Sequence, residues 1–195
     1  MKFSRIALLL IAVAISAPLN AQIFHNLELS GGWTHSTGNN GLDGFNVGAG
    51  VWFTRRVSVV FDFDNVHDTS ALTQFALTGG LITTRNNLQN YLIGPRVFFG
   101  SKSVKILHTL QPFGEFQIGG SHLHSEVSQV GAPTQRVSDN AGTWLLGGGG
   151  DVVLSRHWAG RINLDLLRTH FVDAGQSRLR IVFGVAYTMG NRKVE

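Results

Sequence analysis

The stretch that decides the fold is Arg178-Leu-Arg-Ile-Val-Phe-Gly-Val-Ala-Tyr-Thr-Met189, in which every odd-numbered position is apolar. Between these positions stand Arg178, Arg180 and mostly small residues. Side chains alternate between the two faces of a β-strand, so strict alternation over about ten residues predicts a strand with one apolar face.

The same alternation recurs along the chain and predicts an all-β fold. Helix-period patterning is hard to find, and after residue 22 no apolar run reaches the roughly 18 residues that a membrane-spanning helix needs. Together with the first stretch, the pattern predicts eight strands, within residues 27–33, 45–53, 57–64, 90–99, 110–119, 144–154, 161–171 and 178–189.

The predicted connections alternate between short and long. Short turns at one end and long loops at the other are typical of an up-and-down antiparallel meander, and an even strand number puts both termini on the same side, the periplasm. A ten-residue strand rises about 33 Å. Tilted by about 40°, it spans about 25 Å, the height of the apolar band of outer-membrane barrels. The short set comprises residues 54–56, 100–108 and 155–160, and the mostly longer, polar, glycine-rich set comprises 35–43, 67–87, 120–142 and 172–176.

The two faces of these strands differ in chemistry. One is almost entirely aliphatic and aromatic, and the other carries glycine, small polar residues and charge. A soluble barrel of the lipocalin kind would turn the apolar face inward, but each lipid-facing charge costs about 2–4 kcal/mol and only 14% of the chain is charged. We therefore predict an eight-stranded antiparallel transmembrane β-barrel, apolar outside. Its charged residues are predicted to pair across the lumen: Glu28, Asp62, Asp64, Arg96, Glu115, Asp151, Arg161, Asp165, Arg178 and Arg180.

Residues 1–21 have the layout of a secretory signal peptide. Lys2 and Arg5 precede an apolar run over residues 6–17, and Ala21 offers a small residue for cleavage before Gln22. Without Lys2 and Arg5 the formal charge falls from +4 to +2, so the basic balance is no argument for a polyanionic partner. The chain has no cysteine, which excludes disulfides, Cys-ligated metals and a lipid-modified cysteine.

Several stretches resemble small outer-membrane β-barrel proteins of the OmpA-like type. Asn90-Tyr-Leu-Ile-Gly-Pro-Arg96 is similar to a strand of that family, and residues 111–114, 147–151 and 165–171 look like its later strands. The resemblance covers residues 22–190 and implies an integral outer-membrane barrel. Two departures stand out: Tyr187 is the nearest candidate for the terminal aromatic and precedes a polar tail at 191–195, and we expect no peptidoglycan-binding domain.

Three motifs raise the possibility of chemistry. His122 and His124 are two residues apart and Glu126 continues their parity, as metal ligands on a strand would, but we expect this segment to be a solvated loop. Lipid A deacylases need a His-x-Ser pair with a carboxylate, and neither Ser121 nor Ser125 has that spacing from the histidines. The glycine run 147–150 lacks the Lys-Ser/Thr of a phosphate-binding loop, so we attribute it to strand curvature.

The sequence therefore predicts an outer-membrane barrel with a structural or interaction role, no catalytic residue, no cofactor and no metal. Its expected partners are outer-membrane lipid, the barrel-assembly machinery and an extracellular partner that contacts loops 67–87 and 120–142; no basic-plus-aromatic surface suggests nucleic acid. We expect a monomer. A narrow porin-like channel is the alternative, and a lipid-modifying enzyme is a distant third.

Overall fold

The computed structural model describes residues 27–37, 41–72, 82–104, 108–129, 133–171 and 174–190. Nine strands account for most of these residues, and eight of them form the barrel wall. The predicted signal peptide and the tail 191–195 lie outside the described residues. The strands are β1 (Leu27–Ser36), β2 (Leu42–Trp52), β3 (Val57–Leu72), β4 (Ile82–Phe98), β5 (Lys102–Val104), β6 (His108–Gln129), β7 (Gln135–Val153), β8 (Trp158–Phe171) and β9 (Ala174–Thr188).

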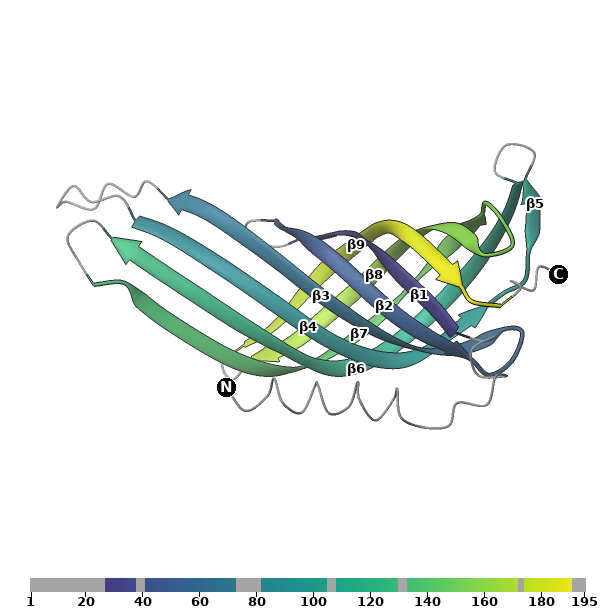
Figure 1. Cartoon of the computed structure of the whole chain (residues 1–195). Helices are drawn as coiled ribbons and strands as arrows, with labels where there is room; N and C mark the ends of the chain where they lie inside the picture. Colours follow the sequence, from purple (N-terminus) through teal and green to yellow (C-terminus); the bar gives the residue numbers. More distant parts are fainter. Residues whose placement is uncertain are drawn as a thin grey trace, which may run out of the picture.

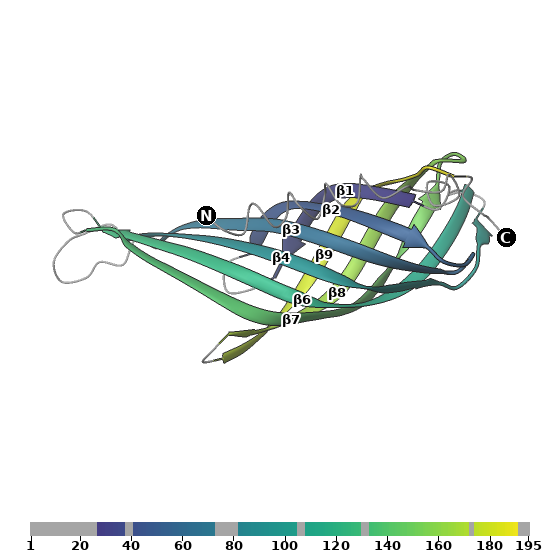
Figure 2. The same cartoon turned by 60° about the horizontal axis from the view of Figure 1, so that its bottom comes forward.

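The barrel is closed and antiparallel throughout. Each wall strand pairs with its neighbour in sequence, β4 pairs with β6, and β9 returns to β1 through the register Glu28↔Thr188 to Ser36↔Arg180. The three-residue β5 pairs only with the start of β6. Figures 1 and 2 show the eight strands wrapped obliquely around one axis. The eight-stranded up-and-down barrel predicted from the alternation is confirmed.

The two ends of the barrel differ. At the turn end, β1 begins beside the end of β9, and the short turns after β2 and β7 are closed by hydrogen bonds such as Phe53 N to Val57 O and Leu154 N to Trp158 O. At the opposite, loop end, β1 passes to β2, β3 to β4, β6 to β7 and β8 to β9.

The prediction of long loops at 67–87 and 120–142 is wrong for most of their length. β3 and β4 stay paired as far as Leu72↔Ile82, and β6 and β7 as far as Val127↔Gln135. These four strands therefore continue past their neighbours as a four-stranded sheet, which we call the paddle: residues 67–72, 82–87, 124–129 and 135–138. It projects from the loop end in Figures 1 and 2. The sequence alternation did not predict these strand extensions, because both faces of the paddle lie outside the apolar band and carry mostly polar residues.

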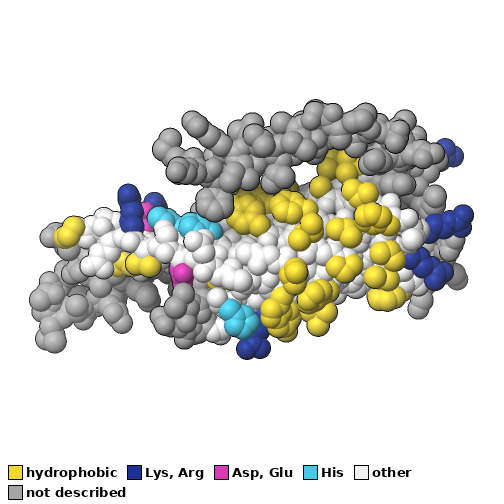
Figure 3. All heavy atoms as spheres, turned by 90° about the horizontal axis from the view of Figure 1, so that it is seen from below, with side chains coloured by type: hydrophobic (Ala, Val, Ile, Leu, Met, Phe, Trp, Pro, Cys, Tyr) yellow, Lys and Arg dark blue, Asp and Glu magenta, His cyan; other side chains and the backbone are white. Residues whose placement is uncertain are grey.

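The predicted facing of the strands is confirmed. On β9, Phe183 and Val185 are exposed on the outside, whereas Val182 and Ala186 are buried in the interior. The outward side chains of all eight wall strands form an apolar band around the barrel, part of which Figure 3 shows in yellow. Among the described residues, no helix is long and apolar enough to cross a membrane.

Candidate functional site in the barrel interior

The centre of the barrel interior holds the guanidinium of Arg96. Its Nε and Nη2 donate to Glu115 Oε2 at 2.8 and 2.7 Å, which β4–β6 pairing makes possible because Arg96 and Glu115 are register partners. Nη1 lies 3.5 Å from Glu28 Oε1, and Nη2 lies 3.8 Å from Asp62 Oδ2. Arg96 is 1% exposed, so one buried cation ties together four strands, β1, β3, β4 and β6.

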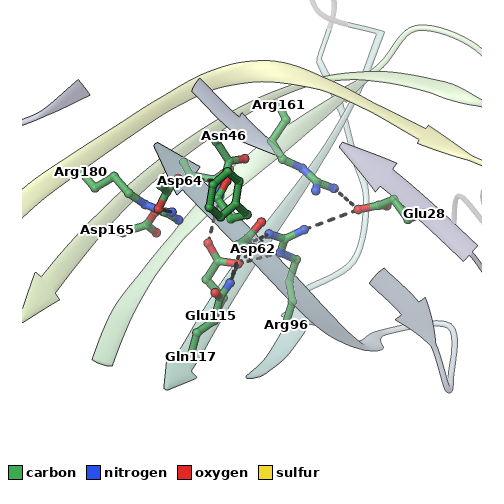
Figure 4. A network of polar contacts seen from close by, with 12 residues as sticks. Glu28, Asn46, Asp62, Asp64, Arg96, Glu115, Gln117, Arg161, Asp165 and Arg180 are labelled. Carbon is green, nitrogen blue, oxygen red and sulfur yellow. Dashed lines mark hydrogen bonds and ion pairs between the residues drawn. The ribbon is translucent and has the colours of Figure 1, made fainter. Parts of the chain in front are cut away.

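Arg161 on β8 forms a second cluster. It donates to both oxygens of its register partner Asp151, at 2.7 and 2.8 Å, and to Glu28 Oε1 at 2.6 Å. Glu28 thus bridges Arg96 and Arg161, as Figure 4 shows. The ring of Phe113 lies under both guanidiniums, 4.7 Å from Arg96 Cζ and 5.3 Å from Arg161 Cζ, where its π-face stabilises the two like charges.

Arg180 on β9 makes the third cluster. Its Nη1 donates to Asp64 Oδ2 at 2.6 Å, and its Nε and Nη2 donate to Asp165 Oδ2 at 3.0 and 2.8 Å. Asp64 also accepts a hydrogen bond of 2.9 Å from Asn46 Nδ2. Figure 4 shows Arg180, Asp64 and Asp165 grouped apart from the Arg96 cluster.

Three amides donate hydrogen bonds to acids within these clusters, and the sequence analysis did not identify them. Gln117 Nε2 donates to Asp62 at 2.6 Å and to Glu115 at 3.1 Å, and Asn163 Nδ2 donates to Glu115 at 2.9 Å. Asn46 is the third. Phe113 and the amides occupy alternate positions that face the interior, as the interior charges do. This alternation is the sequence signal from which they could have been predicted.

Arg178 stands apart from the other nine predicted residues. Its parity is that of Arg180, but its guanidinium donates to Gln176 Oε1 at 2.8 Å, and it forms no ion pair with any acid that the structure describes. Two residues farther toward the loop end, it is only partly buried. The predicted pairing of Arg178 across the lumen is therefore wrong.

Two glycines make room for these side chains. A Cβ on Gly147 would lie 2.0 Å from Asp165 Oδ1 and 2.7 Å from the carbonyl oxygen of Leu164. A Cβ on Gly48 would lie 2.5 Å from Asp62 Oδ1. The glycine-rich interior face thus gives space to longer neighbours.

The interior is not uniformly polar, which differs from the sequence-based expectation. Leu92, Leu145 and Leu167 form a fully buried cluster on the loop side of the charges of their strands. A second cluster, Leu42, Val66 and Leu88 with Leu123 packed against it, lies farther toward the loop end. These apolar side chains fill the lumen where a water-filled channel would need polar walls.

The candidate catalytic and metal motifs are not assembled into such sites. The segment 122–126 belongs to β6, not to a loop, and places His122 and His124 outside, hydrogen-bonded to Asn140 and Ser138 of β7. Ser121 faces inward, where its Oγ contacts Asn90 and Thr143. Within the described ranges, no group of three His, Asp or Glu side chains is arranged to hold a metal ion.

Several solved outer-membrane proteins share this architecture. The attachment invasion locus protein Ail of Yersinia pestis has a TM-score of 0.57 at 15% identity, with 84% of this chain and 98% of Ail covered. Neisserial surface protein A has a TM-score of 0.54 at 10% identity, with 83% and 95% covered. The chain has the fold of the eight-stranded outer-membrane barrels. A structure of Ail with the heparin analogue sucrose octasulfate gives a TM-score of 0.54 at 12% identity and coverages of 83% and 95%. No protein-family model matches the chain, and no curated protein matches it.

Proposed function

We propose that this barrel resides in the bacterial outer membrane, anchors the paddle there and presents it to an extracellular polypeptide. Residues 1–21 would direct secretion and be removed, the barrel-assembly machinery would insert the mature chain as a monomer, and the filled barrel would add to the strength of the envelope. The paddle carries this proposal. β6 has 22 residues, about twice the ten or so that cross the membrane.

The paddle has two free edges, and the edge on β7 continues past the paddle as far as Ala141. β2 accompanies β3 only as far as His67, and β8 accompanies β7 only as far as Gly142. Beyond these points, residues 68–72 of β3 and 135–141 of β7 pair on one side only among the described strands. Unpaired backbone N–H and C=O groups on a strand edge are a template for an additional strand, so an extended segment of a partner protein is the ligand that such edges fit.

The filled interior favours this role over the porin-like alternative. The arginines Arg96, Arg161 and Arg180 are each at most 4% exposed, and the leucine clusters follow toward the loop end. An eight-stranded barrel is only wide enough for its own side chains. Both kinds of filling support a barrel whose lumen is closed to ions.

Three measurements test the proposal. Planar-bilayer recordings of the refolded full chain should show no regular conductance steps; such steps would favour the channel. Segmental hydrogen exchange, recorded with a panel of extended peptides, should show protection of residues 68–72 or 135–141 while the inner strands β4 and β6 stay unchanged. If no peptide protects either edge, the paddle is not a strand-binding surface. Recovery of the protein in the soluble periplasmic fraction would contradict the membrane placement itself.

A further inference from the structure

A shallow hollow of about 320 Å³ lies at the base of the paddle, and polar and charged residues line it, Asp68 and Asn86 among them. His67, Asn87 and His124 form one row across β3, β4 and β6, and Arg85 and Glu126 face each other in the next row. Each of these five side chains is an even number of residues from a lipid-facing residue of its own strand. The hollow therefore opens on the outer surface, in line with the apolar band.

Several polar groups in the hollow lack partners. Arg85 is exposed, and neither its side chain nor that of His67 forms a hydrogen bond or ion pair with any residue that the structure describes. Two acceptor oxygens of the lining, Asn87 Oδ1 and Asp68 Oδ2, are buried and accept no hydrogen bond within the described part of the chain. Glu126 differs, because Arg136 Nη2 lies 3.2 Å from its carboxylate and neutralises it.

These groups define the chemistry of a ligand. A free guanidinium favours phosphate, which accepts charge-assisted hydrogen bonds from it. A buried carbonyl oxygen such as Asn87 Oδ1 needs a donor, such as a hydroxyl group. His124 also lines the hollow and is held by a 3.0 Å contact between its Nδ1 and Ser138 Oγ, which leaves Nε2 without a hydrogen bond to the described residues. A phosphorylated sugar supplies both the anion and the hydroxyl groups.

The height of the hollow above the apolar band indicates which kind of molecule supplies that sugar. Tyr91, half-exposed on the outer face, marks the border of the apolar band as interfacial aromatics do. Asn87 is four residues farther along β4, which corresponds to about 13 Å along the strand and about 10 Å in height at a tilt of about 40°. A phospholipid headgroup layer is only about 5–8 Å thick. The hollow thus lies at the level of a larger, saccharide headgroup.

Other outward side chains at this border have similar chemistry. Five of the chain's eight histidines occupy outward positions just past the apolar band: His35, His67, His122, His124 and His170. Figure 3 shows histidines and arginines at the edge of the hydrophobic band. Imidazole N–H groups donate hydrogen bonds in either protonation state, which suits a layer of phosphates and hydroxyls.

We propose that the hollow binds the phosphorylated sugar headgroup of an outer-leaflet glycolipid, with Arg85 on the phosphate and His67, Asn87 and His124 on the sugar. This inference rests on the outer-membrane placement proposed above. It assigns the hollow to lipid that surrounds the barrel, whereas the free paddle edges remain available to a protein partner.

The test uses the full chain refolded into phosphatidylcholine vesicles with and without lipid A, a phosphorylated disaccharide lipid. Lipid A retained by the purified protein is quantified by mass spectrometry for the wild type, Arg85→Gln and Arg168→Gln. Arg168 is the control, because it is an outward arginine of β8 past the apolar band and does not line the hollow. Loss of a hydrogen bond to a charged group should lower retention about tenfold in Arg85→Gln and leave Arg168→Gln unchanged.

Each other outcome overturns the proposal in a distinct way. Equal loss in both variants would mean a diffuse charge effect, and no loss in either would mean no site. Competition by millimolar inorganic phosphate would assign the hollow to free phosphate, and Zn²⁺ binding that His67→Gln abolishes while lipid A retention is unchanged would assign it to a metal. If neither the wild type nor any variant inserts into either kind of vesicle, the proposed membrane placement is wrong. If all of them insert normally, a loss of lipid A retention, or its absence, reports on the hollow alone.

Discussion

Arg180 on β9 donates a hydrogen bond to Asp64 on β3 at 2.6 Å, although 116 residues separate them in the chain. β2 and β1 lie between these strands in the barrel wall, so the bond crosses the lumen. Both residues are at most 1% exposed. The bond can form only after the barrel has closed, so this ion pair stabilises the closed barrel rather than any one hairpin.

The interior ion pairs should matter more than those on the surface. Arg96→Ala leaves Glu115 buried without its cation, and breaking a buried pair in this way costs about 3–5 kcal/mol. Arg136→Ala removes an exposed pair with Glu126, worth at most about 1 kcal/mol. Denaturant titration of both variants in lipid vesicles measures the difference. Equal losses would mean that the lumen is wet and that its pairing is unimportant.

The two faces of β9 should respond oppositely to polarity. Phe183 is 49% exposed on the outer face, so Phe183→Arg brings a charge to lipid at a cost of about 2–4 kcal/mol near the midplane. Ala186 is buried beside its register partner Ser30, so Ala186→Ser adds a hydroxyl to a polar neighbourhood and should cost far less. Folding into vesicles followed by denaturant titration compares them. A tolerated arginine and a disruptive serine would mean that the barrel is inside out.

Neighbouring leucines on β7 test whether the interior is packed. Leu145 is fully buried against Leu92 and Leu167, so Leu145→Ala should lower the free energy of unfolding by about 2–5 kcal/mol through the cavity it leaves. Leu146 points outward and is 55% exposed, and Leu146→Ala leaves no enclosed cavity. The same titration reports both. A harmless Leu145→Ala would indicate a loosely filled lumen and revive the channel alternative.

The close approach at Gly147 should not tolerate a methyl group. Its Cβ would lie 2.0 Å from Asp165 Oδ1 and 2.6 Å from Asp165 Cα, so Gly147→Ala must displace both the carboxylate and the backbone of β8. We expect a loss of about 1–3 kcal/mol or more from overpacking, seen as a lower midpoint for the heat-induced mobility shift in gels. Gly142→Ala is the control on the same strand, since nothing lies within 4 Å of its Cβ. Identical midpoints for the two variants would refute the steric role of Gly147.

Alternation along the chain determined the number of wall strands, their antiparallel order and the face that each side chain meets. The period of two links sequence parity directly to a face of the strand, so the positions of Phe183, Asp62 and Arg161 relative to the wall follow without knowledge of the partners. Nine of the ten predicted interior charges lie in the buried clusters for the same reason, since each shares parity with the interior of its own strand.

Only the tertiary structure decided what those side chains contact. The parity of a residue predicts which face of the wall its side chain meets, but not its height along the barrel. Parity therefore could not show that Arg178 lies too far toward the loop end to pair with the interior acids, or that Leu145 is the register partner of Gln117. Parity also fails where both faces meet water: the paddle strands have no apolar face, and they hold together through backbone pairing with neighbours far apart in sequence, such as Arg85 and Glu126. The hollow at the paddle's base follows from that pairing, because it brings His67, Asn87 and His124 into one row from three separate strands.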